Sequence, residues 1–116
     1  MANENVHVLN EVDFDSMVRR RSGPVLVDFT AAWCGPCKAL SPIIARIANE
    51  TLGHVLVASV DVDANPNLAA EFRIRGMPTL VVFQDGREIA RRTGLTNVEG
   101  IRALLEPALA WRGAVA

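Results

Sequence analysis

The two cysteines of the chain, Cys34 and Cys37, lie in the run Cys34-Gly35-Pro36-Cys37. At the start of a helix, residues three apart have Cβ atoms about 5–6 Å apart, so two sulfurs can bond after a small adjustment. A disulfide closing so short a loop contributes only about 2 kcal/mol of loop-closure entropy, against about 4.7 kcal/mol for a 100-residue loop. The spacing therefore favours a reversible redox pair over a structural cross-link.

Length and charge narrow the class of protein. The 116 residues are long enough for one domain, 1–116, with its own core, and we expect a monomer. A net charge of −1, from 12 basic and 13 acidic side chains, gives no field for nucleic acid or a membrane surface. The densest basic run, residues 19–21, is typical of the solvated end of a helix. No apolar signal region or membrane-length apolar run is visible. We therefore expect a cytoplasmic protein in a reducing compartment, where C-x-x-C is catalytic or metal-binding.

Apolar periodicity predicts alternating strands and helices. Residues 25–29 are almost continuously apolar, which is typical of a strand covered on both faces. An Asp85-Gly86 turn signal predicts a hairpin, and Thr96 with Glu99 predicts a capping box. The last helix contains Pro107, and the sequence leaves open whether that helix ends near Glu106 or continues with a kink. The predicted strands are 6–9, 25–29, 55–62, 79–83 and 87–93, and the predicted helices are 10–21, 32–50, one from 65 and one from 96.

This βαβαβαββα order predicts a mixed sheet with helices on both faces, which is an α/β architecture.

One residue is unexpected in the interior of such a sheet. Asp28 interrupts the apolar strand 25–29, where an unpaired carboxylate is expensive to bury. Burial would raise its pKa and let it exchange a proton near neutral pH. A strand-end aspartate satisfied by local hydrogen bonds is the alternative, and the residues alone do not choose between them.

Three segments and one glycine, in this order and spacing, resemble the thioredoxin family. They are VDFTAAWCGPCK at 27–38, DVDANP at 61–66, IRGMPT at 74–79, and Gly94. The match extends over roughly residues 6–109, and the combination is far more specific than any one piece. It implies the thioredoxin fold, a mixed five-stranded sheet flanked by four helices. It also implies a general protein-disulfide reductase that performs reversible dithiol–disulfide exchange.

The resemblance assigns catalytic roles within the motif. Cys34 would be the nucleophile, and Cys37, one turn further into the helix and less exposed, would be the resolving cysteine. Gly35 and Pro36 separate them, and proline suits a first helical turn because its missing N–H costs nothing there. Asp28 would lie beneath the cysteines and assist the deprotonation of Cys37.

Elementary chemistry supports the role of Cys34. The thiolate is the attacking species, and a free cysteine with a pKa near 8.5 is only about 3% ionised at pH 7. A helix N-terminus favours negative charge by at most about 2 kcal/mol, or about 1.5 pK units, which ionises roughly half of the thiols. A lowered cysteine pKa is also a known property of this family.

The resemblance also indicates a partner-binding surface formed by Trp33, Gly76, Met77, Pro78 and Gly94, with a cis bond between Met77 and Pro78 in a loop against the sulfurs. Glycines let another backbone approach closely, and Trp and Met offer adaptable apolar contact. For Gly94 a simple turn role is equally open. The partners would be disulfide-containing proteins and a separate thioredoxin reductase, because the chain has no nucleotide- or flavin-binding glycine motif. No cofactor beyond the cysteine disulfide and no metal are expected.

Two positions depart from the family pattern. Many bacterial thioredoxins carry a lysine near the buried aspartate, at the position of Ser59, and Lys38 is the only lysine in this chain. We therefore expect desolvation, rather than a cation, to set the pKa of Asp28. Thr30 stands where some relatives have a tryptophan, which predicts altered packing under the active site.

Three other classes of function share some of these sequence features. A zinc site needs four ligands, and beyond the cysteines only His7 and His54 are available as histidines, far apart in sequence. A disulfide-forming oxidase or isomerase would share the fold, but Gly35-Pro36 resembles the reducing branch. A non-enzymatic assembly subunit could use the same apolar patch without the cysteines.

Overall fold

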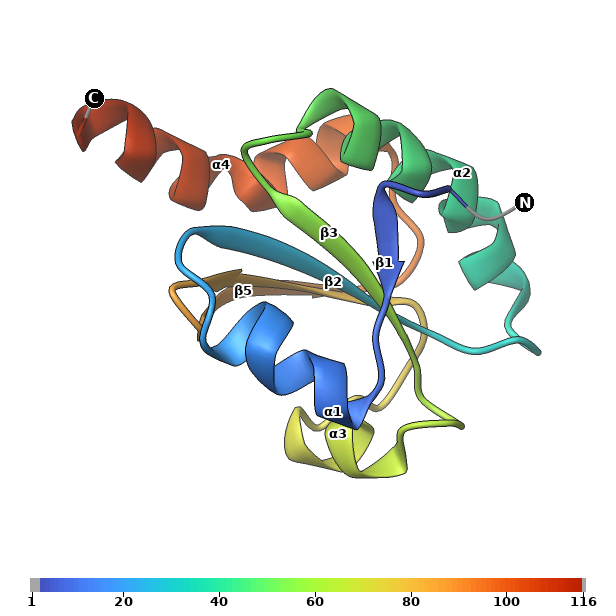
Figure 1. Ribbon diagram of the computed structural model, residues 1–116. Helices are drawn as coiled ribbons and strands as arrows, with labels where there is room; N and C mark the ends of the chain where they lie inside the picture. Colours follow the sequence, from blue (N-terminus) through green and yellow to red (C-terminus); the bar gives the residue numbers. More distant parts are fainter. Residues whose placement is uncertain (1–2, 116) are drawn as a thin grey trace.

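A computed structural model describes the backbone of residues 3–115 and the side chains of residues 3–109 (Figure 1). Five strands form one sheet in the order β1-β3-β2-β4-β5. β1, β3 and β2 are parallel, whereas β4 is antiparallel to β2 and β5 is antiparallel to β4. The predicted mixed five-stranded sheet is therefore confirmed. The elements are β1 (Val6–Val8), α1 (Glu11–Phe14), the π-helical η1 (Asp15–Arg19), β2 (Pro24–Thr30), α2 (Gly35–Glu50), β3 (Leu56–Asp61), α3 (Pro66–Glu71), β4 (Thr79–Gln84), β5 (Arg87–Thr93) and α4 (Val98–Val115).

Helices cover both faces of the sheet, as the element order predicted. Figure 1 shows α1 and α3 on one face and α2 and α4 on the other. The first face holds an aromatic cluster in which Phe72 contacts Phe14, Phe29 and Phe83 with ring centroids 5.4–5.9 Å apart. The second face is aliphatic, and there Leu40 and Ile44 of α2 pack with Ile101 of α4. No helix within residues 3–115 is long and apolar enough to cross a membrane.

The central strand β2 holds the two layers together. Side chains alternate across a strand, so Val25, Val27 and Phe29 enter the aromatic layer. Leu26 enters the aliphatic layer beneath α2. Asp28 has the same parity as Leu26, and its side chain therefore lies on the α2 face of the sheet.

The first helix differs from the prediction of a regular helix over residues 10–21. The α-helix ends at Phe14 and continues as π-helix through Arg19, with the Arg20 N–H bonded to the Asp15 carbonyl five residues back. In this wider segment the Arg19 guanidinium lies 5.3 Å from the centroid of the Phe14 ring and bonds to Glu71 of α3. These tertiary contacts are invisible to periodicity, which detects only that Phe14 and Val18 share a face.

Two predicted helix boundaries were wrong, and one open question is answered. α2 begins at Gly35 rather than 32, because Cys34 keeps an extended backbone and acts as the N-cap. α4 is capped by Asn97, whose Oδ1 accepts from the Gly100 N–H at 2.8 Å, so the predicted Thr96 cap is displaced by one residue. The helix continues through Pro107.

The hairpin between β4 and β5 is confirmed. Asp85 and Gly86 have φ values of 53° and 81°, as a type I′ turn requires. The Asp85 carboxylate accepts from the Gly23 N–H at 2.7 Å, which ties the turn to the start of β2. A side chain at Gly86 would place its Cβ 2.1 Å from the Arg19 carbonyl oxygen, so this turn also packs against the end of η1.

Candidate active site

The sulfur of Cys34 caps the N-terminus of α2. Cys34 has φ −88° and ψ 112°, and its Sγ accepts a hydrogen bond from the backbone N–H of Cys37 at 3.2 Å. An N-cap oxygen from Ser or Asp normally takes this place. Pro36 lies in the first turn, where the missing N–H leaves no bond unmade. An unpaired helix N–H and the positive end of the helix dipole are thus directed at the sulfur.

The two cysteines form a disulfide, with their Cα atoms 5.3 Å apart. The structure therefore represents the oxidised state of the pair. In this state both cysteines are buried to a similar extent, with Cys34 4% and Cys37 3% exposed. Met77 and Val62, which are themselves only half-buried, pack against the pair. The intervening Gly35 is exposed.

The loop before β4 lies against the disulfide, as the resemblance implied. The Met77–Pro78 bond is cis, and Met77 packs on the cysteines. The Thr79 hydroxyl donates to the Gly76 carbonyl at 2.6 Å. The Gly94 N–H donates to the Pro78 carbonyl at 2.8 Å, so the end of β5 fixes the same loop. Pro78 is itself buried, which leaves Met77 and Gly76 as the accessible part of the loop.

The two glycines of the expected partner surface are needed for different reasons. A Cβ at Gly76 would lie 3.3 Å from Cγ2 of Thr93, so close packing against β5 favours a residue without a side chain. Gly94 has φ 104° and open space around it, so its requirement is conformational. The turn role that the sequence left open for Gly94 is therefore present.

Trp33 projects from the site and is 67% exposed. Its indole N–H donates to the Asp63 carboxylate at 2.8 Å, across 30 residues of sequence. The Asp61 carboxylate accepts from the backbone N–H groups of Asp63 and Ala64 and so fixes that loop. Asp63 was not predicted as a site residue, because nothing in its local sequence indicates which side chain it meets. Asp63 thereby orients the exposed indole of Trp33, the residue before Cys34.

Asp28 is buried in β2, with 5% of its surface exposed. Its Oδ1 has no hydrogen-bond partner among the described residues, which argues against the strand-end alternative. Desolvation raises the pKa of Asp28 from 3.8 to about 7. Asp28 and Ser41 of α2 line the same cavity, and Ser41 lies one helical turn after Cys37. The carboxyl therefore lies on the α2 side of the sheet, beside the cavity that Ser41 also lines.

The departure at Ser59 has a direct structural consequence. Ser59 is the β3 partner of Asp28 in the sheet register. With Asp28 and Ser41 it lines a cavity of about 140 Å³, and no lysine is among its lining residues. Burial is the cause of the raised pKa of Asp28, as the absence of a lysine predicted.

Thr30, the second departure, ends β2 beside the site. Its carbonyl accepts from the Val62 N–H at 2.9 Å, which holds Val62 where it packs against the cysteines. Within the residues that the structure describes, no three His, Cys, Asp or Glu side chains gather in a way that could hold a metal ion.

A helix-capping C-x-x-C disulfide beside a cis-proline loop defines a thiol–disulfide oxidoreductase site. Comparisons with known proteins identify the family. The Thioredoxin family model matches residues 5–107. The thioredoxin of Chlamydia trachomatis is 39% identical over 100 residues, covering 86% of this chain and 95% of the relative. The thioredoxin of Acidithiobacillus ferridurans is 40% identical over 101 residues, covering 87% of this chain and 94% of the relative.

The thioredoxin of Staphylococcus aureus is 39% identical over 98 residues, covering 84% of this chain and 92% of the relative. The chain therefore belongs to the thioredoxin family, and it is a protein-disulfide oxidoreductase that works through the C-G-P-C motif.

Burial of Asp28 predicts an unusual dependence of stability on pH. The folded state binds this proton more tightly than the unfolded chain, so the free energy of unfolding falls as pH rises from 3.8 to about 7. Asp28→Asn removes the ionisation. We expect the oxidised variant to match wild type at the acid end and to exceed it by on the order of 4 kcal/mol above the raised pKa.

Urea denaturation across this pH range measures the difference. Glu106→Gln, at an exposed position of α4, is the control and should leave the pH profile unchanged. A constant offset between Asp28→Asn and wild type at every pH would show that the carboxyl does not titrate in this range.

Proposed function

We propose that this chain is a general reductase of protein disulfides, acting in the cytoplasm as a monomer and as one domain, and re-reduced by a separate thioredoxin reductase. The observation that carries the proposal is the Cys34 sulfur at the N-terminus of α2, within hydrogen-bond distance of the Cys37 N–H. A group so placed is stabilised as a thiolate once the disulfide is reduced. The exposed Trp33 and half-buried Met77 beside it support contact with large substrates.

The proposed reaction has two exchange steps. The Cys34 thiolate attacks one sulfur of a substrate disulfide, the substrate S–S bond breaks, and one substrate thiolate leaves. The Cys37 sulfur, after losing its proton, attacks Cys34 in the mixed disulfide and displaces the second substrate thiolate. Two electrons have then moved to the substrate, and the Cys34–Cys37 disulfide seen in the structure is the product form. The reductase returns two electrons to it.

Asp28 is proposed as the group that accepts the Cys37 proton. A general base is most effective when its pKa lies near the working pH, and burial raises the pKa of Asp28 to about 7. Its unpartnered Oδ1 leaves a lone pair available. The shared cavity with Ser41 supports a position within about one helical turn of Cys37.

The first prediction concerns the two cysteines. With insulin, NADPH and a thioredoxin reductase, Cys34→Ser should reduce the rate of disulfide reduction to background, because no thiolate starts the reaction. Cys37→Ser should still attack once and accumulate a mixed disulfide, visible as a reducible adduct on a non-reducing gel. Full activity of Cys34→Ser would exclude the proposed role. If the wild-type protein itself did not reduce insulin, the reductase proposal would fail, and a non-enzymatic role as an assembly subunit would be favoured.

The second prediction concerns proton transfer. Asp28→Asn should slow the resolution of a preformed mixed disulfide roughly 10- to 100-fold near neutral pH, because the base is gone. It should also flatten the pH dependence of that step around the pKa of about 7. Rapid mixing followed by acid quench measures resolution separately from the first attack. An unchanged pH profile would remove Asp28 from the mechanism.

The third prediction concerns the partner surface. Trp33→Ala should raise the KM for a protein disulfide about fivefold or more, the effect expected for loss of an exposed aromatic anchor. The rate with a small aromatic disulfide should stay within about twofold, because such a substrate needs no docking surface. Val12→Ala, a similarly exposed apolar position on α1, is the matched control. Equal losses with both substrates would mean that Trp33 acts on the cysteines instead.

A further inference from the structure

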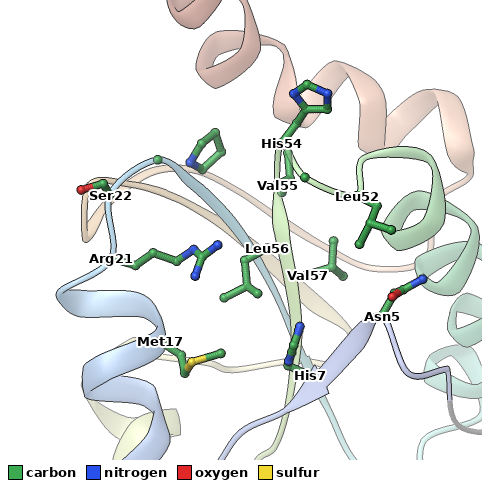
Figure 2. Close-up of a pocket in the computed structure, with 13 residues that line it drawn as sticks. Asn5, His7, Met17, Arg21, Ser22, Leu52, His54, Val55, Leu56 and Val57 are labelled. Carbon is green, nitrogen blue, oxygen red and sulfur yellow. The ribbon is translucent and has the colours of Figure 1, made fainter.

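A second cavity, of about 390 Å³, lies where β2 begins, away from the disulfide. Pro24 lines this cavity, whereas Thr30 ends the same strand beside the active site. These two residues are the ends of a seven-residue strand, and they lie about 20 Å apart. Three segments surround the space: the end of η1 with the turn after it, the start of β1, and the loop that leads into β3 (Figure 2). The thiol chemistry uses none of these residues.

The walls of this cavity combine apolar and polar surface in similar shares. Leu56 and Val57 of β3 contribute buried side chains, and Met17 of η1 adds a half-buried thioether. Leu52, in the loop after α2, borders the same space and is 63% exposed. Because Leu52 is exposed at the edge of this cavity, its side chain is available to cover the hydrocarbon part of a ligand.

One side chain that lines this cavity, the exposed Arg21, carries a permanent positive charge. Figure 2 shows the Arg21 side chain extending from the segment after η1 towards Leu56 on β3. Its neighbours in the basic run behave differently, since Arg19 pairs with Glu71 and Arg20 pairs with Asp15. Arg21 forms no ion pair with any side chain in residues 3–109. Its guanidinium therefore retains its donors for an anion from outside the chain.

The charge around the cavity has one sign. The titratable groups among its lining residues are Arg21, His7 and His54, and no Asp or Glu is among the described lining residues. In Figure 2 His7 faces the space from β1, whereas the His54 ring points away from it. The Asn5 amide also lines the cavity; its Nδ2 donates one hydrogen bond to Asn49 Oδ1 at 2.7 Å, which leaves its second N–H for another oxygen. A cation would meet no compensating charge here, and an anion would.

We propose that this cavity binds a small organic carboxylate with an apolar body, such as a medium-chain monocarboxylate. The Arg21 guanidinium holds the carboxylate, because its planar array of N–H groups matches two carboxylate oxygens. The surface formed by Met17, Leu52 and Leu56 covers the hydrocarbon part. This site is additional to the disulfide chemistry and does not depend on the proposed function.

The competing account is that Arg21 only lays its aliphatic stem over apolar surface, with its head in water, as long cationic side chains commonly do. The two accounts differ in what they predict for an anion and a neutral molecule of equal shape. If Arg21 only covers apolar surface with its aliphatic stem, the anion and the neutral molecule would bind equally weakly. Replacing the Arg21 guanidinium with an uncharged group would then not change binding of either one.

The test uses hexanoate and its neutral isostere hexanamide, titrated into the full-length ¹⁵N-labelled oxidised protein and followed by amide chemical shifts. Hexanoate should cause saturable shifts at residues 21–23 and 52–57, and hexanamide should bind at least tenfold more weakly. Arg21→Gln should weaken hexanoate binding at least tenfold, and Leu52→Asn should weaken it severalfold. Both positions are exposed, so folding should be retained, and the amide spectrum checks it.

Arg20→Gln, the adjacent arginine already paired with Asp15, is the matched control and should bind hexanoate like wild type. Insulin reduction by Arg21→Gln should equal that of wild type, which separates this site from the active site. Absence of saturable shifts, equal binding of the acid and the amide, or unchanged binding by Arg21→Gln would each overturn the proposal. Equal loss in Arg20→Gln would also overturn it, by reducing the effect to overall charge.

Discussion

The hydrogen bond from the Cys37 N–H to the Cys34 sulfur connects the local helix geometry to the chemistry of the site. It makes a sulfur the capping group of α2, so the helix starts at Gly35 and its dipole ends on the atom that must carry negative charge. A thiol without such a donor is mostly protonated at neutral pH. The same hydrogen bond therefore sets both the residue at which the helix begins and the reactivity of the cysteine.

The sheet contributes a second group whose ionisation is set by its surroundings, the carboxyl of Asp28. The fold buries its carboxyl between β2 and α2 with an unpartnered oxygen, which costs free energy whenever the group ionises. With serine at position 59, burial is the cause of the raised pKa, no cation lines the small cavity beside the carboxyl, and none of the residues 3–109 offsets that cost. The same burial that lowers stability raises the pKa into the range useful for proton transfer. A destabilising residue at the centre of a strand is consistent with selection for function.

Features that depend on local chemistry could be predicted well. The Asp85-Gly86 hairpin follows from the positive φ values that such turns require, and the two-sided burial of β2 follows from its apolar run. Features set by distant contacts could not. The π-helical turn of η1 accompanies the contact of Arg19 with Glu71, and the orientation of Trp33 depends on Asp63, 30 residues away. Among the described residues, Arg19 and Arg20 form ion pairs and Arg21 does not, because acidic side chains lie close to the first two in space.

The redox pair, the element order, the family and the conflict posed by Asp28 could all be read from residue types and short spacings. How far Asp28 is buried, what covers the disulfide, and where the cavity at Arg21 lies became visible only once the chain was folded. Burial and pairing are properties of several segments together. Their free energies depend on distances through space, and a linear order of residues does not specify those distances until the sheet has formed.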